Sequence, residues 1–324
     1  MLMHACLELV MNAVVQFRQP HSPASASLAD FACTWFDQVS IGWRVSTQRR
    51  VGHILQRYLL PELKMHRIDG FDRAALMGLR LRLARESGCS TKRINAVLQV
   101  LAQCLGEREY RYGIVNPGRS LPPLPVARPQ IQPFTLPELQ RLRAAAPAHL
   151  SEYVWIRGLV GLRSGEANGL CWDCVDRARR TLEVRRARAD GRESLPKTAS
   201  SQRLIPMCAA VAEAFDRQWQ LTGSVGGYVF LSRRGRALDI QNFARRDWRR
   251  ILEAEGLAFR GPEQLRHTAA TLMLAAGEAP TFVAQVLGHA DCRMLLTIYA
   301  RHVAGATGRR DGVALEAMLR ERTR

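Results

Sequence analysis

Six prolines lie between residues 117 and 133, and this density constrains the fold more than any other feature of the sequence. Proline has no amide hydrogen to donate and fixes its own φ, so such a run supports neither a helix nor the interior of a sheet. We therefore predict a stiff, extended linker between two domains. The predicted parts are an N-terminal extension over residues 1–27, a helical domain over 28–117, the linker over 118–134, a second domain over 135–306 and a C-terminal tail with helical spacing over 307–324.

The first domain is predicted to be helical throughout. Apolar residues recur at helical spacing, as in Leu28, Phe31 and Trp35, and no alternating pattern of any length appears before Asn116. The predicted helices begin at Leu28, at Ser46 or Thr47, at Asp72, and at Ser90 or Thr91, and Pro61 is expected to end the second of them.

The second domain is predicted to combine helices with a small sheet. Thr135 is placed to cap its first helix, and residues 151–170 are typical of a buried helix, a turn and the start of another helix. Residues 181–188 alternate in part and residues 201–206 are short, which favours a hairpin or a small three-stranded sheet. Residues 228–231 are either a short strand or a buried connection. The chain is therefore expected to be mostly α, with a small antiparallel β-sheet.

The charge of the chain indicates the class of partner. There are 47 Lys and Arg residues against 29 Asp and Glu, which gives a net charge of +18. The excess is present in residues 1–116 and again in residues 117–324, so both domains are basic. This favours a nucleic acid gripped along its length over a membrane surface. The candidates for phosphate contact near predicted helix starts, each of which could equally be an ordinary solvated charge, are Arg44, Arg49, Arg50, Arg57, Lys92 and Arg93.

The cysteines and the N-terminus argue against other classes of protein. Of eight cysteines only Cys171 and Cys174 are close in sequence, and one such pair cannot complete a zinc site, so no metal is predicted. The pair is interpreted as small apolar residues in a reducing compartment, with a redox pair as the alternative. Residues 1–17 lack a basic start and are interrupted by polar residues, so neither a signal peptide nor a membrane span is expected. A cytoplasmic, nucleoid-associated protein is the resulting interpretation.

Three short amphipathic helices are predicted between residues 261 and 299. Glycines end the first two and an aspartate can cap the third, at Gly277, Gly288 and Asp291. Because helix ends and turns bring side chains together, Arg266, His289 and Tyr299 are expected to lie close to one another.

Arg163 and Lys197 are further candidates in the first half of this domain. Arg163 lies between apolar residues and a Ser-Gly turn, where an unpaired guanidinium would be costly, so it needs an anionic partner. Glu166 offers one within the chain, and the same ambiguity between an internal ion pair and a bound anion applies to Arg266. Lys197 lies beside a predicted turn in a chain with 3 lysines, and lysine can give up its proton where arginine cannot.

Two arginines, a lysine, a histidine and a tyrosine suit the transesterification of a phosphodiester. A tyrosine oxygen can attack phosphorus while the guanidiniums bind the non-bridging oxygens and the histidine donates a further hydrogen bond. The lysine can protonate the leaving 5′ oxygen. The covalent tyrosyl link conserves the energy of the broken bond, so neither ATP, nor a metal, nor any other cofactor is expected.

Five segments together resemble the tyrosine recombinase (phage integrase) family, and they occur in that family's order. They are Gly161–Glu166, Pro196–Pro206, Leu265–Thr268, Leu287–His289 and Tyr299. The resemblance covers residues 135–305 and extends more loosely to 28–117. It implies a helical core-binding domain and a mixed α/β catalytic domain that clamp duplex DNA, with four protomers acting on two duplexes through a Holliday junction.

The resemblance also implies a role for each matched residue. Arg163 and Arg266 would clamp the scissile phosphate and His289 would hydrogen-bond it. Lys197 would be the general acid, and Tyr299 would be the nucleophile that forms a 3′-phosphotyrosine. Supporting residues would be Glu166 and His267, and Arg203 joins the candidates for DNA contact.

One position departs from the family's pattern. Three residues before Arg266 the family usually has His or Lys, whereas this chain has Glu263. A carboxylate could accept the tyrosine proton, but it would repel a phosphate. The general base is therefore left open.

These observations predict a site-specific DNA recombinase of a mobile element, acting as integrase or transposase. Its partners would be a duplex with a specific site, three further copies on DNA and, in some settings, a directionality factor; free protein would be a monomer or weak oligomer. The alternatives are a catalytically impaired DNA-binding protein of the same fold and a type IB topoisomerase-like enzyme. The tail would either dock on a neighbouring protomer or pack locally.

Overall fold

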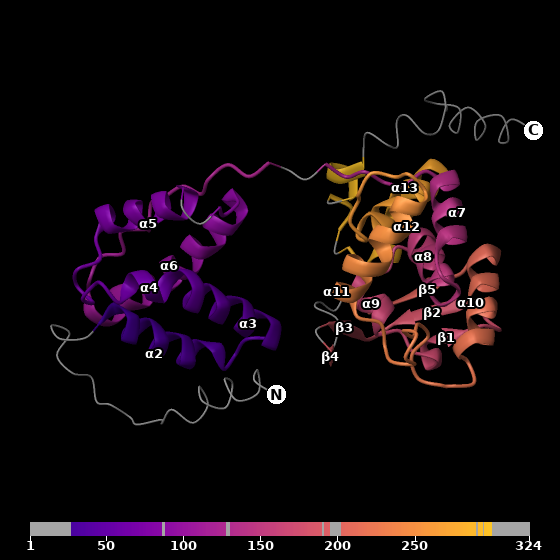
Figure 1. Ribbon diagram of the computed structural model, residues 1–324, viewed down its shortest axis with the longest axis horizontal. Helices are drawn as coiled ribbons and strands as arrows, with labels where there is room; N and C mark the ends of the chain where they lie inside the picture. The colour runs from indigo at the N-terminus through magenta and orange to yellow at the C-terminus, as the bar shows by residue number, and fades with distance from the viewer. Residues whose placement is uncertain are drawn as a thin grey trace, which may run out of the picture. The chain divides into compact units, whose positions relative to one another are not determined.

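A computed structural model describes residues 27–85, 88–127, 130–189, 191–194, 202–289, 291–293 and 295–299. The chain divides into two compact units, Met1–Arg128 and Pro129–Arg324 (Figure 1). Lys197, nearly all of the predicted N-terminal extension and the whole C-terminal tail lie outside the described residues. Within the described part, no helix combines the length and the apolar character that crossing a membrane requires.

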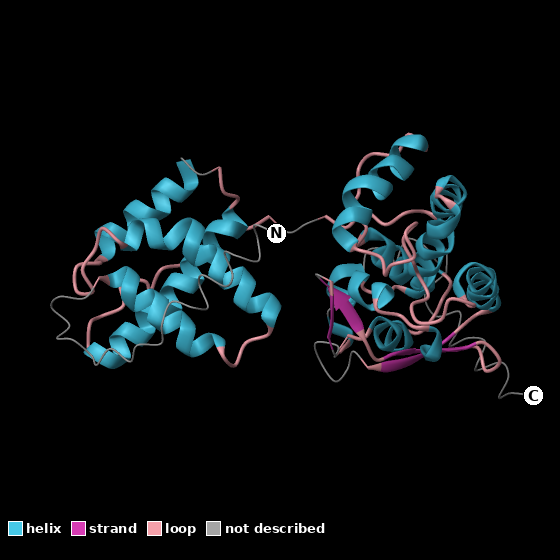
Figure 2. Cartoon of the chain, turned by 60° about the horizontal axis from the view of Figure 1, so that its bottom comes forward, coloured by secondary structure: helices cyan, strands magenta, loops and turns pink. Residues whose placement is uncertain are grey.

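The first unit is a bundle of helices around one apolar core (Figure 2). Its described helices are α2 (Leu28–Ser40), α3 (Val45–Ile54), the π-helical turn η2 (Leu55–Leu59), α4 (Leu60–Leu63), α5 (Arg73–Arg85) and α6 (Thr91–Tyr112). The longest, α6, begins where the Ser90 hydroxyl accepts a hydrogen bond from the Arg93 amide and ends at Gly113, whose positive φ suits glycine. It packs against α2, α3, α5 and η2, so it is the centre of the bundle.

Two predicted helix boundaries in this unit are wrong. Arg44, and neither Ser46 nor Thr47, is the residue that precedes α3. Pro61 does not end a helix, because it lies in the first turn of α4, directly after the π-helical turn η2. The intervening π-helical turn, η2, carries the chain from α3 into α4 without a break.

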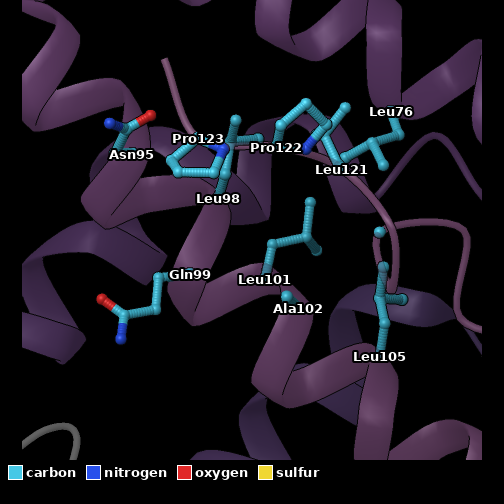
Figure 3. Close-up of a pocket in the computed structure, with 11 residues that line it drawn as sticks. Leu76, Asn95, Leu98, Gln99, Leu101, Ala102, Leu105, Leu121, Pro122 and Pro123 are labelled. Atoms are coloured by element: carbon cyan, nitrogen blue, oxygen red, sulfur yellow. The ribbon is translucent and has the colours of Figure 1, made fainter. Parts of the chain in front are cut away.

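The first half of the proline-rich segment is packed on the helical unit. The side chain of Asn95 on α6 accepts a hydrogen bond from the amide of Leu124 and donates one to its carbonyl, each at 2.8 Å. Leu121 and Leu124 contact the apolar core. Pro122 lies beside Leu121 over an apolar hollow of about 250 Å³ that is floored by α6 (Figure 3). The extended stretch is therefore shorter than the sequence alone predicts.

The second half of the segment is attached to α13 (Gln264–Ala275) of the second unit. The amide of Gln132 donates to the side-chain oxygen of Gln264 at 2.9 Å, and that of Phe134 donates to the hydroxyl of Thr268 at 2.8 Å. Thr135 then forms the predicted cap, as part of a reciprocal capping box with the glutamate of the next turn.

The second unit is built around α8 (Ala148–Val160), which packs against α7 (Leu136–Ala145), α10 (Ala209–Thr222) and α13 (Figure 1). Nine of the thirteen residues of α8 are buried, and they include the charged residues Glu152 and Arg157. The other described helices and helical turns are α9 (Ser164–Asn168), η3 (Trp172–Cys174), α11 (Ile240–Asn242), η5 (Phe243–Asp247), α12 (Trp248–Ala254) and α14 (Pro280–Leu287).

Two small antiparallel sheets complete this unit. Their strands, drawn in magenta in Figure 2, lie together at one side of the unit. One has the order β1 (Val175–Asp176), β2 (Thr181–Val184), β5 (Arg203–Pro206), and the other pairs β3 (Ala187–Ala189) with β4 (Arg192–Ser194). In the first sheet Leu182 lies opposite Ile205, and both are buried. The segment predicted as a strand or a connection, residues 228–231, makes only isolated bridges and is a connection. The predicted fold class, mostly α with small antiparallel β-structure, is confirmed.

Candidate active site

Three successive carbonyls at the C-terminal end of α14 each accept a hydrogen bond from an arginine of a different segment. The pairs are Arg203 with Val286 (2.6 Å), Arg266 with Leu287 (2.7 Å) and Arg163 with Gly288 (2.9 Å). The last carbonyls of a helix lack intrahelical donors and carry its negative partial charge, so they attract cations. We call the resulting group the arginine cluster, which consists of Arg163, Glu166, Arg203, Arg266 and His289.

Glu166 is the anion within the arginine cluster. Its carboxylate is buried and bonds Arg163 at 2.7 Å and Arg203 at 2.9 Å, while the Arg163 amide donates to it in a helix-capping arrangement. Burial alone would raise the pKa of Glu166, but the hydrogen bonds and charge of Arg203, together with Arg163, hold that pKa below its ordinary value. Glu166 is therefore ionised and offsets part of the positive charge around it.

Arg266 also bonds Gly161, the residue that ends α8. Its second nitrogen donates to the carbonyl of Gly161 at 2.8 Å. Gly161 has a φ of +73°, and a Cβ there would approach Leu287 to 2.5 Å, so both the backbone conformation and the close packing require glycine. Burial and the neighbouring Arg163 lower the pKa of Arg266 to about 10, which leaves the guanidinium charged at neutral pH.

His289 follows the left-handed Gly288 at the end of α14. Burial, and then the charges of Arg266, Arg163 and Arg203, lower the pKa of His289 to about 4, so its imidazole is neutral. Its Nδ1 atom is buried and has no hydrogen-bond partner among the described residues. A buried polar atom without a partner is uncommon, because such atoms are nearly always hydrogen-bonded in folded proteins.

Tyr299 occupies a separate, apolar setting that we call the tyrosine pocket. Tyr299 is 2% exposed and lies in a final helical stretch that includes residues 295–299. It packs with His267 and with apolar residues of α13, α14 and this stretch, namely Ala270, Leu274, Val283, Ala284, Leu287 and Leu295. The Tyr299 hydroxyl lies 2.6 Å from Nδ1 of His267. Burial raises the pKa of Tyr299 to about 12, with Arg266 acting in the opposite direction. Asp291 accepts a hydrogen bond from the Arg293 amide at 2.8 Å, as expected of the cap of this helix.

Glu263 contacts residues of α8 and of the start of α9. Its carboxylate contacts the hydroxyl of Ser164 and lies 3.5 Å from Arg157, whose guanidinium is fully buried in α8. Arg157 also donates to Ser164 at 2.9 Å. The sequence interpretation did not single out Arg157 or Ser164, although a charged residue in the otherwise apolar stretch 154–160 is a signal that it needs a partner.

The structure brings Arg163, Arg266, His289 and Glu166 together at the end of α14, and it places Tyr299 against the helix that carries Arg266. The prediction that Arg203 contacts DNA is wrong, because its side chain is buried against Glu166 and is not on the surface. The candidates on the first unit are exposed near the starts of α3 and α6, and they are Arg44, Arg49, Arg50, Lys92 and Arg93. No group of residues suited to hold a metal ion occurs in the described part of the chain, and its cysteines are free thiols.

The second unit thus combines arginines bonded to the end of one helix with a buried tyrosine packed on the same helix. Comparison with known proteins identifies the family to which this arrangement belongs. The profile of the phage integrase family matches residues 138–305, and the chain belongs to that family. The resemblance to tyrosine recombinases is thereby confirmed. A XerC-like tyrosine recombinase of Caldanaerobacter subterraneus subsp. tengcongensis is 27% identical over 197 residues, which is 52% of this chain and 50% of that protein. The chain spans about half the length of the curated relatives that it matches.

Solved structures share the fold. The Tn1549 transposon integrase, in complex with a circular intermediate DNA, superposes with a TM-score of 0.74 at 20% identity, covering 91% of this chain and 99% of that one. A lambda integrase tetramer bound to a Holliday junction gives a TM-score of 0.70 at 16% identity, covering 90% of this chain and 87% of that one.

Proposed function

We propose that this chain is a site-specific DNA recombinase that cuts and rejoins duplex DNA through a 3′-phosphotyrosine. The observation that carries the proposal is the arginine cluster beside Tyr299. Arg163 and Arg266 each spend two donors on the protein, and a guanidinium has five, so donors remain for the oxygens of a phosphate. Family membership supports the same chemistry.

In this proposal the cluster stabilises the charge that develops on the phosphate, and Tyr299 supplies the attacking oxygen. Arg163 and Arg266 bind the non-bridging oxygens, and His289, which lies near both arginines, adds a hydrogen bond. Lys197 protonates the leaving 5′ oxygen. The tyrosyl link conserves the energy of the broken bond, so strand exchange needs neither ATP nor a metal.

The partners follow from charge and from the relatives. Residues 28–117 would bind the DNA core, with the exposed cations near the starts of α3 and α6 contacting phosphates, and residues 135–306 would carry catalysis. A lambda integrase is found as a tetramer on a Holliday junction, and the Tn1549 integrase serves a transposon. We therefore assign this chain to a mobile element, as a homotetramer on a specific duplex site, in the cytoplasm with the nucleoid.

Covalent capture from duplexes of random sequence tests the proposal and identifies the target site in one experiment. Each duplex is nicked near its centre so that the cleaved end diffuses away, and protein-linked strands are recovered and sequenced after incubation with the protein. Wild-type protein is expected to enrich one sequence, linked through its 3′ end to Tyr299. Tyr299→Phe should bind the enriched duplex and yield no link. A variant that still becomes linked would show that another residue is the nucleophile, and salt-dependent binding without any link would favour a DNA-binding protein without cleavage activity.

A further inference from the structure

The contact between His267 and Tyr299 is the closest that the described structure gives to the proposed nucleophile. Nδ1 of His267 and the hydroxyl oxygen of Tyr299 are 2.6 Å apart, a short hydrogen-bond distance. His267 directly follows Arg266 on α13, so the helix that carries a phosphate-binding arginine also holds the attacking oxygen. His289, by contrast, belongs to the arginine cluster.

We propose that His267 is the general base of strand cleavage and accepts the hydroxyl proton of Tyr299 at Nδ1. The inference rests on the proposed recombinase function and assigns the step that the sequence left open. As the bond from the Tyr299 oxygen to phosphorus forms, the tyrosine proton passes to His267 and the bond from phosphorus to the 5′ oxygen breaks. The leaving oxygen takes a separate proton, which Lys197 supplies in the proposed mechanism.

The surroundings of His267 keep its imidazole neutral and able to accept a proton. Burial, and then the adjacent charge of Arg266, lower the pKa of His267 below its ordinary value. Tyr299, with a pKa raised to about 12, does not ionise unaided at neutral pH. A neutral imidazole has one ring nitrogen with a free lone pair, and the geometry places Nδ1 at the hydroxyl that must lose its proton.

Glu263 acquires a physical role from this assignment. It directly precedes α13, one turn before His267, and its negative charge raises the pKa of His267 against the effect of Arg266. A cation at this position would make the imidazole a weaker base. Ser164 and Arg157 hold the carboxylate in place. In this proposal Glu263 does not take the tyrosine proton itself but affects cleavage through the pKa of His267. Among the described residues, the charged and titratable groups acting on His267 are thus Arg266 from α13, Glu263 directly before α13, and Tyr299 from the helical residues 295–299.

Single-turnover cleavage of the duplex enriched by covalent capture tests the assignment. Wild-type protein is compared with His267→Ala, which removes the base, and with His267→Asn, which keeps a polar group of similar reach but cannot take the proton. Both variants are expected to form the covalent complex about 10²- to 10⁴-fold more slowly. Imidazole in solution should restore part of the rate of His267→Ala. His149→Asn, which changes a half-buried histidine elsewhere in the same unit, is the matched control and should cleave as wild type does.

A second substrate separates the base from the acid. When sulfur replaces the leaving 5′ oxygen, the departing thiolate needs no proton, so this substrate should rescue Lys197→Ala and leave both His267 variants slow. Glu263→Gln should shift the acid limb of the rate–pH profile to lower pH, because loss of the carboxylate lowers the pKa of His267.

The outcomes are distinguishable. Full activity of His267→Asn would show that His267 only positions the tyrosine and does not take its proton. Faster cleavage by His267→Ala would show that the contact restrains the tyrosine. Either result overturns the assignment of His267 as the general base. Equal DNA affinity and equal thermal unfolding of the variants and wild type show that slow cleavage is not a folding defect, and imidazole rescue shows it independently. A wild-type protein that forms no covalent complex overturns the recombinase function, and this inference with it.

Discussion

The arginine cluster and the tyrosine pocket share α13 and α14 but are stabilised in different ways. In the arginine cluster, guanidiniums are fixed by Glu166 and by backbone carbonyls at the ends of two helices. In the tyrosine pocket, a neutral side chain is held by apolar packing and one hydrogen bond to a neutral histidine. The cluster therefore has its donors in place before any DNA binds, whereas the pocket keeps the nucleophile protonated until a base acts on it.

The comparison predicts that removing one charge from the cluster costs far more stability than removing the polar group of the pocket. Glu166→Gln keeps the shape of the side chain but leaves the buried guanidinium of Arg203 without its anion, and breaking such a pair typically costs about 3–5 kcal/mol. The free energy of unfolding in urea measures this loss. Glu183→Gln, which breaks an exposed pair with Arg185 on the same unit, is the control and should cost about 0–1 kcal/mol. Equal losses in the two variants would contradict a special role for burial.

Local sequence rules predicted some of this arrangement. The caps at Ser90, Thr135 and Asp291 depend on side chains that bond backbone amides two or three residues away, so a single sequence reveals them. The helix end at Gly288 could also be predicted from local sequence, because a glycine that follows a short apolar helix commonly adopts the left-handed conformation.

Contacts across the chain could not be predicted in the same way. Arg163 bonds the carbonyl of Gly288, 125 residues away, and the sequence left open whether its partner was a ligand or the protein. Arg203 was a candidate for DNA contact by its charge alone, and only the packing of β5 against α14 shows that its guanidinium bonds the carbonyl of Val286 inside the unit. The contact of His267 with Tyr299 likewise depends on how the last helix docks, which no local pattern encodes.

Substitution of Arg163 tests the catalytic role of the arginine cluster at a member whose side chain is 39% exposed. Arg163→Ala should slow covalent-complex formation on the enriched duplex by about 10²- to 10³-fold, because one donor to the developing charge is lost. Its effect on unfolding should be small beside that of Glu166→Gln. Arg163→Lys keeps the charge but loses the planar fork, so it should recover only part of the rate. A lysine variant as fast as wild type would mean that charge alone suffices.

Acid should weaken the cluster through His289. Its folded pKa of about 4 lies below its ordinary value of 6.5, so between these pH values the unfolded chain binds a proton that the folded chain does not. Stability is therefore lost as pH falls through this window and is fully present above it. Because the imidazole is only half-buried, we expect a loss on the order of 1 kcal/mol between pH 7 and pH 5. Urea unfolding of His289→Asn should lack this part of the loss, and a variant as acid-sensitive as wild type would place the titration elsewhere.

The tyrosine pocket should respond least to loss of its polar group. Tyr299→Phe removes the hydroxyl and its bond to His267 but keeps the ring and its packing, so unfolding should become easier by about 1 kcal/mol or less. Tyr299→Ala, which also removes the ring, should cost about 3–5 kcal/mol through the cavity that it leaves. The same Tyr299→Phe protein is expected to lose all covalent linkage, so its chemistry and its stability are separable at one oxygen atom. A stability loss as large as that of Glu166→Gln would mean that the hydroxyl anchors the pocket as charge anchors the cluster, and the contrast between the two regions would fail.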